Sequence, residues 1–454
     1  MPALKTATFA LFAALTGCGG GNAAPPPSQD QSRATAAADT PAIVAAAKPV
    51  TGAGTDYDDV VAVAGAARRV LLGESTHGTH EYYRERGRIT ERLIVEHGFN
   101  AVAIEGDWSP TWRLNQYVRG LGSDRSAEAA MGGFTRFPKW MWSNVEFRDF
   151  VERLRTLNIT RPEAERVGLY GMDVYDLSEA AGAVLAWLKQ VDASAARRVE
   201  RLYDCFDGYR GSTDAYGQAA QAGSSCQKQA EAALAEVRRI PRPGEPAAAE
   251  RRFAAVRAAA SVAGAEAYFR TVYAGSLAWN VRDQRMAENV EEIAAHHEAL
   301  TGRPGKVVMW SHNTHSGDAR ATFAANRGEL NLGQLMRQRH GDAAFLIGFF
   351  SFTGTVFAAP EWDRPGRVYD MKPALAGSYS ALFHSMGIPT FSLLIRGNAE
   401  VTRLLEGPML ERAIGVVYHP QSERPSHYFG AELSGQFDAA IYFDRSKAVT
   451  PLRR

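Results

Sequence analysis

Residues 69–105 read RVLLGESTHGTHEYYRERGRITERLIVEHGFNAVAIE and contain two short apolar runs on either side of a longer helical pattern. The two runs, Arg69–Gly73 and Asn100–Ile104, have the length of buried strands. Between them Tyr82, Ile89 and Leu93 recur at the spacing that places side chains on one face of a helix. Such alternation of strands and helices is typical of an α/β sheet that is covered on both faces.

Apolar runs of the same kind recur through most of the chain. Each fits a buried strand and several end in a polar residue; they are Val167–Met172, Val307–Ser311, Ala344–Phe350, Phe391–Ile395, Ile414–Tyr418 and Ala439–Phe443. We therefore predict an α/β fold with a central, mostly parallel or mixed sheet flanked by helices. The mixed strands are expected near the C-terminus.

Residues 177–301 differ in character from the rest of the chain. They are rich in Ala, Glu and Arg, carry apolar residues at helical spacing such as Val184 and Leu188, and contain no strand-like run. We predict that they form an all-helical subdomain of four or five helices. This subdomain would be inserted into an α/β catalytic domain made of residues 51–176 and 302–454.

The overall composition narrows the class of protein. The 454 residues include 51 Lys and Arg against 50 Asp and Glu, so the formal net charge is +1. Because a surface that binds nucleic acid normally shows as a basic excess, we expect no nucleic-acid partner. A hydrophobic content of 45% fits an ordinary globular core. Since no G-x-G-x-x-G follows a strand and no P-loop occurs, we expect no nucleotide cofactor, and we predict no cofactor at all.

The N-terminus has the pattern of a targeting segment. Residues 1–17 contain an early Lys, an apolar run and small residues, as a secretory signal peptide does. Leu15–Cys18 matches the lipobox of bacterial lipoproteins, in which the cysteine is acylated, and residues 18–50 have the composition of a disordered tether. We expect a lipid-anchored protein on the periplasmic face of the outer membrane, with lipidated Cys18 as its membrane contact. The alternative is a plain signal peptide with a chance cysteine.

The chain has two other cysteines, Cys205 and Cys226. Export would bring them into an oxidising compartment, where a disulfide between them is the default expectation. The alternative is a pair of buried free thiols.

Polar side chains follow four of the predicted strands at the point where each strand ends. They are Glu74, Glu105, Asp173 and His312. In open α/β sheets, ligands bind beyond the carboxyl ends of the strands, so we expect these side chains to meet. Each residue alone is a weak signal, because an acidic residue after a strand is more often a helix cap or a turn residue.

Glu74 and His77 are predicted to lie on one tight loop before a helix that runs to about His97. The positive end of that helix and a neighbouring carboxylate are expected to act on the imidazole of His77 in opposite directions, and the carboxylate fixes its tautomer. This tuning suits a general base. Arg86 lies on the apolar face of the helix, where it needs a partner such as Glu74 or Glu105. A paired Arg86 would stabilise an oxyanion; otherwise its side chain extends to solvent.

His312 and His315 follow the strand predicted at Val307–Ser311 and suit an acid–base pair or a metal pair. Together with His77 and His80 they leave a zinc or dinuclear site open, although the chain has no H-E-x-x-H motif and no cysteine ligand set. Serine hydrolase chemistry lacks its usual signature, because no G-x-S-x-G occurs. Ser75 and Ser311 remain formal candidates for a nucleophile.

Several motifs make the sequence similar to the erythromycin esterase family. The most specific are GESTHGTHEYYRERGRITERLIVEHGFNAVAIEGDW at residues 73–108 and VVMWSHNTHSGD at residues 307–318. The likeness extends to FPKWMW at 137–142, WNVRDQRMAENV at 279–290, NLGQLMRQRHGD at 331–342 and the tail from 411 to 444, and so covers the chain from about residue 55 to its end.

The resemblance implies metal-independent hydrolysis of a cyclic ester by a histidine that activates water. It places the family's general base on His77 and its partner glutamate on Glu74. The family's arginine falls on Arg86, its second glutamate on Glu105, and its His-x-x-His pair on His312 and His315. The leader and tether lie outside the resemblance, and we expect the helical insert to be where the substrate cleft differs.

We therefore predict a carboxylic ester hydrolase that opens a lactone. Erythromycin-like macrolides are the first candidate substrates, and antibiotic resistance is the first candidate role. One alternative is a metal-dependent hydrolase that uses the same histidines and glutamates. Another is a non-catalytic, membrane-tethered protein that binds a ligand or is associated with an envelope polysaccharide.

Overall fold

The central sheet is mixed, as predicted. The computed structural model describes residues 41–209, 212–273 and 277–452. Their main sheet has the strand order β1-β8-β11-β6-β2-β5-β3-β4, with β7 paired to β6. The six strands from β11 to β4 are parallel, whereas β8, β1 and β7 pair antiparallel. In chain order the strands are β1 (Lys48–Pro49), β2 (Arg69–Leu72), β3 (Ala101–Ile104), β4 (Gly168–Gly171), β5 (Val307–Trp310), β6 (Ala344–Ala358), β7 (Arg367–Met371), β8 (Thr390–Leu394) and β11 (Ala439–Ser446).

The central strands are buried on both faces because successive side chains point to opposite sides of the sheet. Val70 and Leu72 pack into one apolar core, together with residues of α2 (Asp58–Gly65), α3 (His80–His97) and α6 (Val145–Ile159). Leu71, between them, packs into a second core on the other face. This arrangement explains why the strands read as continuous apolar runs rather than as alternating ones.

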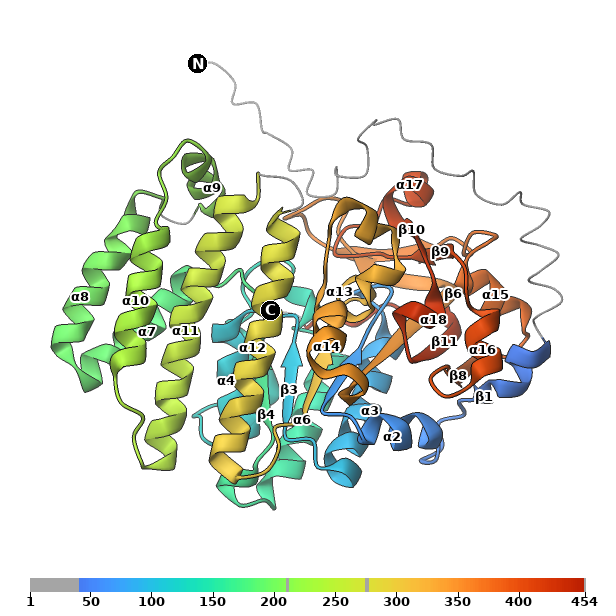
Figure 1. Cartoon of the computed structure of the whole chain (residues 1–454), viewed down its shortest axis with the longest axis horizontal. Helices are drawn as coiled ribbons and strands as arrows, with labels where there is room; N and C mark the ends of the chain where they lie inside the picture. Colours follow the sequence, from blue (N-terminus) through green and yellow to red (C-terminus); the bar gives the residue numbers. More distant parts are fainter. Residues whose placement is uncertain (1–40, 210–211, 274–276, 453–454) are drawn as a thin grey trace.

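The described residues between β4 and β5 form helices and connecting loops, with no strand among them. They form six α-helices, where we predicted four or five: α7 (Ser178–Val191), α8 (Ala193–Tyr203), α9 (Thr213–Gln221), α10 (Gln227–Arg239), α11 (Pro246–Thr271) and α12 (Leu277–Thr301). Figure 1 shows α7, α8, α10 and α11 packed together at one end of the molecule. Their buried residues belong to the same apolar core as Leu71 and Met309 of the sheet. The predicted disulfide between Cys205 and Cys226 is present.

The strand predicted at Ile414–Tyr418 is wrong. That segment makes only isolated bridges, Thr76 with Ile414 and Ala359 with Val417. Its backbone pairs with the loop after β2 instead of a strand: the Ile414 N–H donates to Ser75 O (2.8 Å), and the His77 N–H donates to Ile414 O (3.1 Å). The neighbouring residues form a separate two-stranded sheet of β9 (Met409–Arg412) and β10 (Tyr428–Ala431), which the sequence analysis missed.

The register of the parallel strands brings their ends together. Leu72 is level with Trp310, and Ile104 is level with both Trp310 and Gly171. The polar residues that follow these strands therefore meet at one edge of the sheet, near the short helix α13 (Asn313–Ser316).

The predicted signal peptide, the lipobox with Cys18 and most of the tether lie outside the described residues. Within the described part of the chain, no helix is long and apolar enough to cross a membrane.

Candidate active site

A carboxylate between a histidine and an arginine forms one half of the site. Glu74 Oε1 lies 2.8 Å from His77 Nδ1, and Glu74 Oε2 accepts a hydrogen bond from Arg86 Nη2, also at 2.8 Å. Since a carboxylate only accepts hydrogen bonds, His77 carries its proton on Nδ1 and its Nε2 is left as the base. The glutamate therefore fixes both the tautomer and the orientation of the imidazole.

Arg86 cannot contact a substrate in this structure. Its side chain and that of Glu74 are both fully buried. Its guanidinium is covered by the rings of Tyr83 and Trp310, whose centroids lie 4.6 and 4.8 Å away. The expectation that Arg86 extends to solvent is wrong, whereas its role toward an oxyanion stays a prediction. Its observed partner is Glu74, so it acts on the site through that carboxylate.

Glu105 connects the ends of β3 and β5 with α12. Its Oε2 accepts the backbone N–H of His312 (2.8 Å), and its Oε1 accepts from Arg282 Nη2 (2.6 Å). Burial alone would raise the pKa of Glu105, but the charge of Arg282 and the backbone N–H of His312 outweigh it, and the pKa of the carboxyl lies well below its ordinary value. Glu105 is therefore a buried anion that holds the His312 loop.

His312 faces His77 across the site, with 4.8 Å between the ring centroids. Its Nδ1 accepts the N–H of Thr314 (3.3 Å), which leaves the proton on Nε2. That Nε2 is buried and makes no hydrogen bond of full geometry among the described residues, although the backbone of Ser75 acts on the ring as a hydrogen-bond partner. Burial, together with the nearby His77, holds the pKa of His312 well below its usual value, so the ring is neutral at pH 7. The site thus offers an N–H donor beside the base.

His315 has both ring nitrogens occupied. Its Nδ1 lies 2.9 Å from each carboxylate oxygen of Asp283, and its Nε2 accepts from Arg282 Nη1 at 3.0 Å. The ring also stacks on Trp279, with centroids 4.4 Å apart. His315 therefore supports the site from behind, and it does not present a free nitrogen to the position between His77 and His312.

The sequence analysis missed two residues of this cluster and gave a third no role. Arg282 and Asp283, both on α12, were missed, although they lie in a motif shared with the resembled family. Asp173 was noted only as a residue at a strand end, and it binds Arg282 Nε and Nη2 at 2.8 and 2.7 Å. The only sequence signal for Arg282 and Asp283 as site residues was that an Arg and an Asp are adjacent in this helical segment.

The residues considered for other chemistries have other partners in the structure. His80 turns away to Glu146 (2.8 Å), and no three His, Cys, Asp or Glu side chains within the described ranges are grouped as metal ligands. Ser75 bonds to the hydroxyl of Tyr82, and Ser311 bonds to Ser316, so neither serine is paired with a histidine base.

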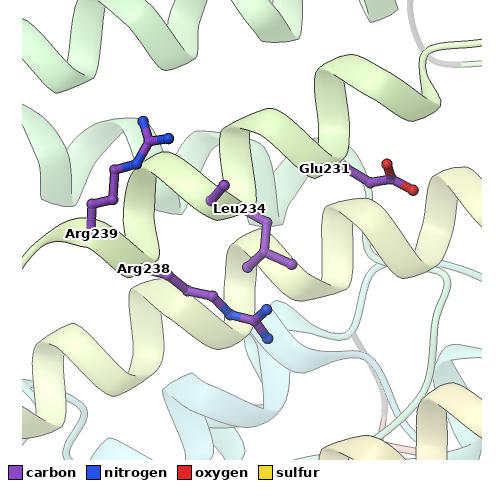
Figure 2. Close-up of a pocket in the computed structure, with 5 residues that line it drawn as sticks. Glu231, Leu234, Arg238 and Arg239 are labelled. Carbon is purple, nitrogen blue, oxygen red and sulfur yellow. The ribbon is translucent and has the colours of Figure 1, made fainter.

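A surface hollow of about 460 Å³ lies elsewhere, along α10 (Figure 2). One helix supplies all of its lining residues, which are Glu231, Leu234, Ala235, Arg238 and Arg239. It contains no histidine and no acid–base pair, and we assign it no chemistry.

The chain matches a family model and several solved structures. The family model, described as erythromycin esterase, matches residues 94–446, a range that includes Glu105, His312 and His315 and begins after His77. A crystal structure described as a succinoglycan biosynthesis protein is 17% identical, covers 94% of this chain and 100% of that one, and superposes with a TM-score of 0.71. A Bacillus cereus protein is 18% identical with the same coverage and TM-score. A histidine-to-asparagine mutant of the erythromycin esterase EreC, in its open conformation, is 16% identical, covers 86% of this chain and 93% of that one, and has a TM-score of 0.59. At these identities the solved structures show a shared fold.

Proposed function

The chain belongs to the erythromycin esterase family, and we propose that it hydrolyses a cyclic carboxylic ester, with His77 as the general base that activates water. The observation that carries this proposal is the buried chain of Arg86, Glu74 and His77, which leaves Nε2 of the histidine as a free base. An esterase that uses water directly needs such a base, held in one tautomer.

In the first step, His77 Nε2 takes a proton from a water molecule as the water oxygen attacks the carbonyl carbon of the ester. The new C–O bond converts the carbonyl oxygen into an oxyanion. The Nε2–H of His312, on a neutral ring that faces His77, is the donor that we assign to this oxyanion. A neutral donor is suited to the task because it does not compete with His77 for the proton.

In the second step, the bond between the carbonyl carbon and the ring oxygen breaks. The leaving alkoxide takes the proton held by His77, which returns the imidazole to its starting state. The products are one carboxylate and one hydroxyl in a single opened chain, with a proton released to solvent. No cofactor is consumed.

The other predicted residues act as positioning residues in this scheme. Arg86 neutralises Glu74 and fixes its direction, and Glu105 holds the backbone of His312. His315, oriented by Asp283, accepts from Arg282 and so helps to place the guanidinium that binds Glu105. Each therefore affects the rate through His77 or His312 rather than by contact with the ester.

Macrolide lactones are the first candidate substrates, and macrolide resistance is the first candidate role. The support is the family itself, together with the erythromycin esterase among the solved structures of similar fold. Other small-molecule lactones and linear esters belong to the same test, because the family supports ester hydrolysis more strongly than any one substrate.

The experiment is a screen of macrolides, simple lactones and linear esters with the wild-type protein and two histidine variants. His77→Asn should lose at least about a hundredfold in kcat. His80→Asn is the matched control, because His80 lies three residues away and pairs with Glu146 instead of the site. Turnover by His77→Asn equal to that of the wild type would refute the assignment of the base, and no turnover of any ester by the wild type would refute the function.

A further inference from the structure

Asn313 links three of the chain segments that carry the site. It follows His312 and is fully buried. Its backbone N–H donates to the carbonyl of Glu74 (2.8 Å), and its side-chain Nδ2 donates to Phe349 O of β6 (3.2 Å). The fit against the loop after β2 is close: a Cβ on Gly73 would lie 2.1 Å from Asn313 Oδ1, so only glycine is accommodated there. A displacement of Asn313 would therefore move both the Glu74 loop and the His312 loop.

Asn313 also contacts a buried carboxyl group that the reaction scheme does not use. Asn313 Nδ2 donates to Glu411 Oε1 of β9 at 3.0 Å. Glu411 is 1% exposed, and its Oε2 has no hydrogen-bond partner in the described part of the chain. The side chain of Gln436, on α18 (Leu433–Gln436), also lies against Glu411, and its Oε1 is a second buried oxygen without a partner.

We propose that Glu411 is a positioning residue for hydrolysis, which acts through Asn313 to hold the loops of Glu74 and His312 in register. This inference rests on the proposed function. The geometric basis of the proposal is that Asn313 contacts β6, β9 and the Glu74 loop at once. Removing the side chain of Glu411 would therefore remove the contact with β9, one of these three.

Glu411 fills this place as a neutral acid. Burial raises its pKa to about 8, against smaller opposing effects of Asn313 and Gln436. The charged and titratable groups around it do not form an ion pair with it: Arg412 on the same strand pairs with Glu423 (3.1 Å) and bonds to the Tyr428 hydroxyl, and Tyr379 of α15 (Tyr379–Ser385) bonds to backbone atoms. Above about pH 8 the buried anion would have no cation beside it, and the link to Asn313 would be strained.

The test compares the wild type with Glu411→Gln and Glu411→Ala, and uses Glu406→Gln as a control on an exposed carboxylate. On an ester that the wild type hydrolyses, kcat is measured between about pH 6 and pH 10. Glu411→Ala should lose about tenfold in kcat at pH 7 with little change in KM, because a buried amide loses a partner. Glu411→Gln should restore most of that rate and abolish the decline of the wild-type rate near pH 8. A Glu411→Gln profile with the wild-type alkaline decline, or a folded Glu411→Ala variant with the wild-type kcat, would overturn the proposal.

A second measurement does not depend on activity, so it separates this proposal from the proposed function. Between the ordinary carboxyl pKa of 4.5 and about 8, the folded wild type keeps a proton that its unfolded state has lost. Its stability must therefore fall as the pH rises through this window and level off above it. The difference in Tm between Glu411→Gln and the wild type should accordingly increase from about pH 5 to pH 9. A difference that stays constant would overturn the neutral state of Glu411, whether or not an ester substrate has been found.

Discussion

Glu74 is the residue on which the catalytic half of the site depends, because His77 and Arg86 are bound to its two oxygens. Both charges of the Arg86–Glu74 pair are fully buried, and taking two charges out of water is costly unless they stay paired. The pair therefore holds His77 in place, and the stability of the protein depends strongly on both of its members.

Arg86→Met should destabilise the protein by about 3 kcal/mol or more, because it leaves a buried carboxylate without its cation. Denaturant unfolding measures the change. Arg84→Met is the control on the same helix, since Arg84 is half exposed and pairs with Glu85, and it should cost less than about 1 kcal/mol. The double variant Glu74→Leu/Arg86→Met should recover stability and remain inactive. An Arg86→Met protein as stable as the control would show that the pair is not buried as described.

His297 should make the protein sensitive to acid. Burial, together with His296 and Arg119, lowers its pKa to about 3, and its Nε2 bonds to the Tyr170 hydroxyl. Because its ordinary pKa is 6.5, the unfolded chain binds a proton between about pH 6.5 and pH 3 that the folded chain does not, so stability falls as the pH falls through that range. Tm measured against pH should decline less steeply for His297→Gln than for the wild type. Equal slopes for the two proteins would contradict the buried neutral state of His297.

At the scale of elements, helix α12 completes a site whose other parts come from the ends of strands. Arg282 and Asp283 reach from α12 to Glu105, Asp173 and His315. Helix α12, the last helix before β5, therefore contacts the edge of the sheet at which the parallel strands end.

Asp283→Asn should reduce kcat by about tenfold and leave KM nearly unchanged, because the tautomer and orientation of His315 depend on a carboxylate at Nδ1. Steady-state kinetics on a hydrolysed ester provide the measurement. Glu288→Gln, on an exposed position of α12, is the matched control. A change confined to KM would instead place Asp283 in substrate binding and contradict its positioning role.

The sequence predicted the elements best where burial and periodicity agree. The strands β2, β3, β4 and β5 are apolar on both faces, and each was located to within two residues. The segment Ile414–Tyr418 has the same composition, but its backbone pairs with the loop after β2, a contact that depends on tertiary structure.

The same distinction applies to the site. Glu74, Glu105, Asp173 and His312 could be grouped because parallel strands end at one edge, and the structure does bring them together. Arg282 and Glu411 reach the cluster only through the packing of α12 and β9, which no local pattern encodes. The complete burial of Arg86 could not be predicted for a related reason, because spacing on a helix does not reveal how deeply the helix is buried.

At the scale of the whole molecule, we propose that the folded domain is held at a membrane by a lipid on Cys18, at the end of a polar tether. This proposal rests on the lipobox and the tether composition alone. Expression of Cys18→Ala should move the protein from the detergent-soluble membrane fraction to the soluble fraction, with an unchanged specific activity. Membrane association that persists in Cys18→Ala would contradict the lipid anchor.

The central claim is that water activated by His77 attacks the carbonyl carbon of an ester. Mass spectrometry of a lactone opened by the enzyme in isotopically labelled water tests it most directly. The account predicts one heavy oxygen in the new carboxylate, none in the new hydroxyl, and intact lactone with His77→Asn. Heavy oxygen in the hydroxyl, or the same labelled product from His77→Asn at the wild-type rate, would contradict it.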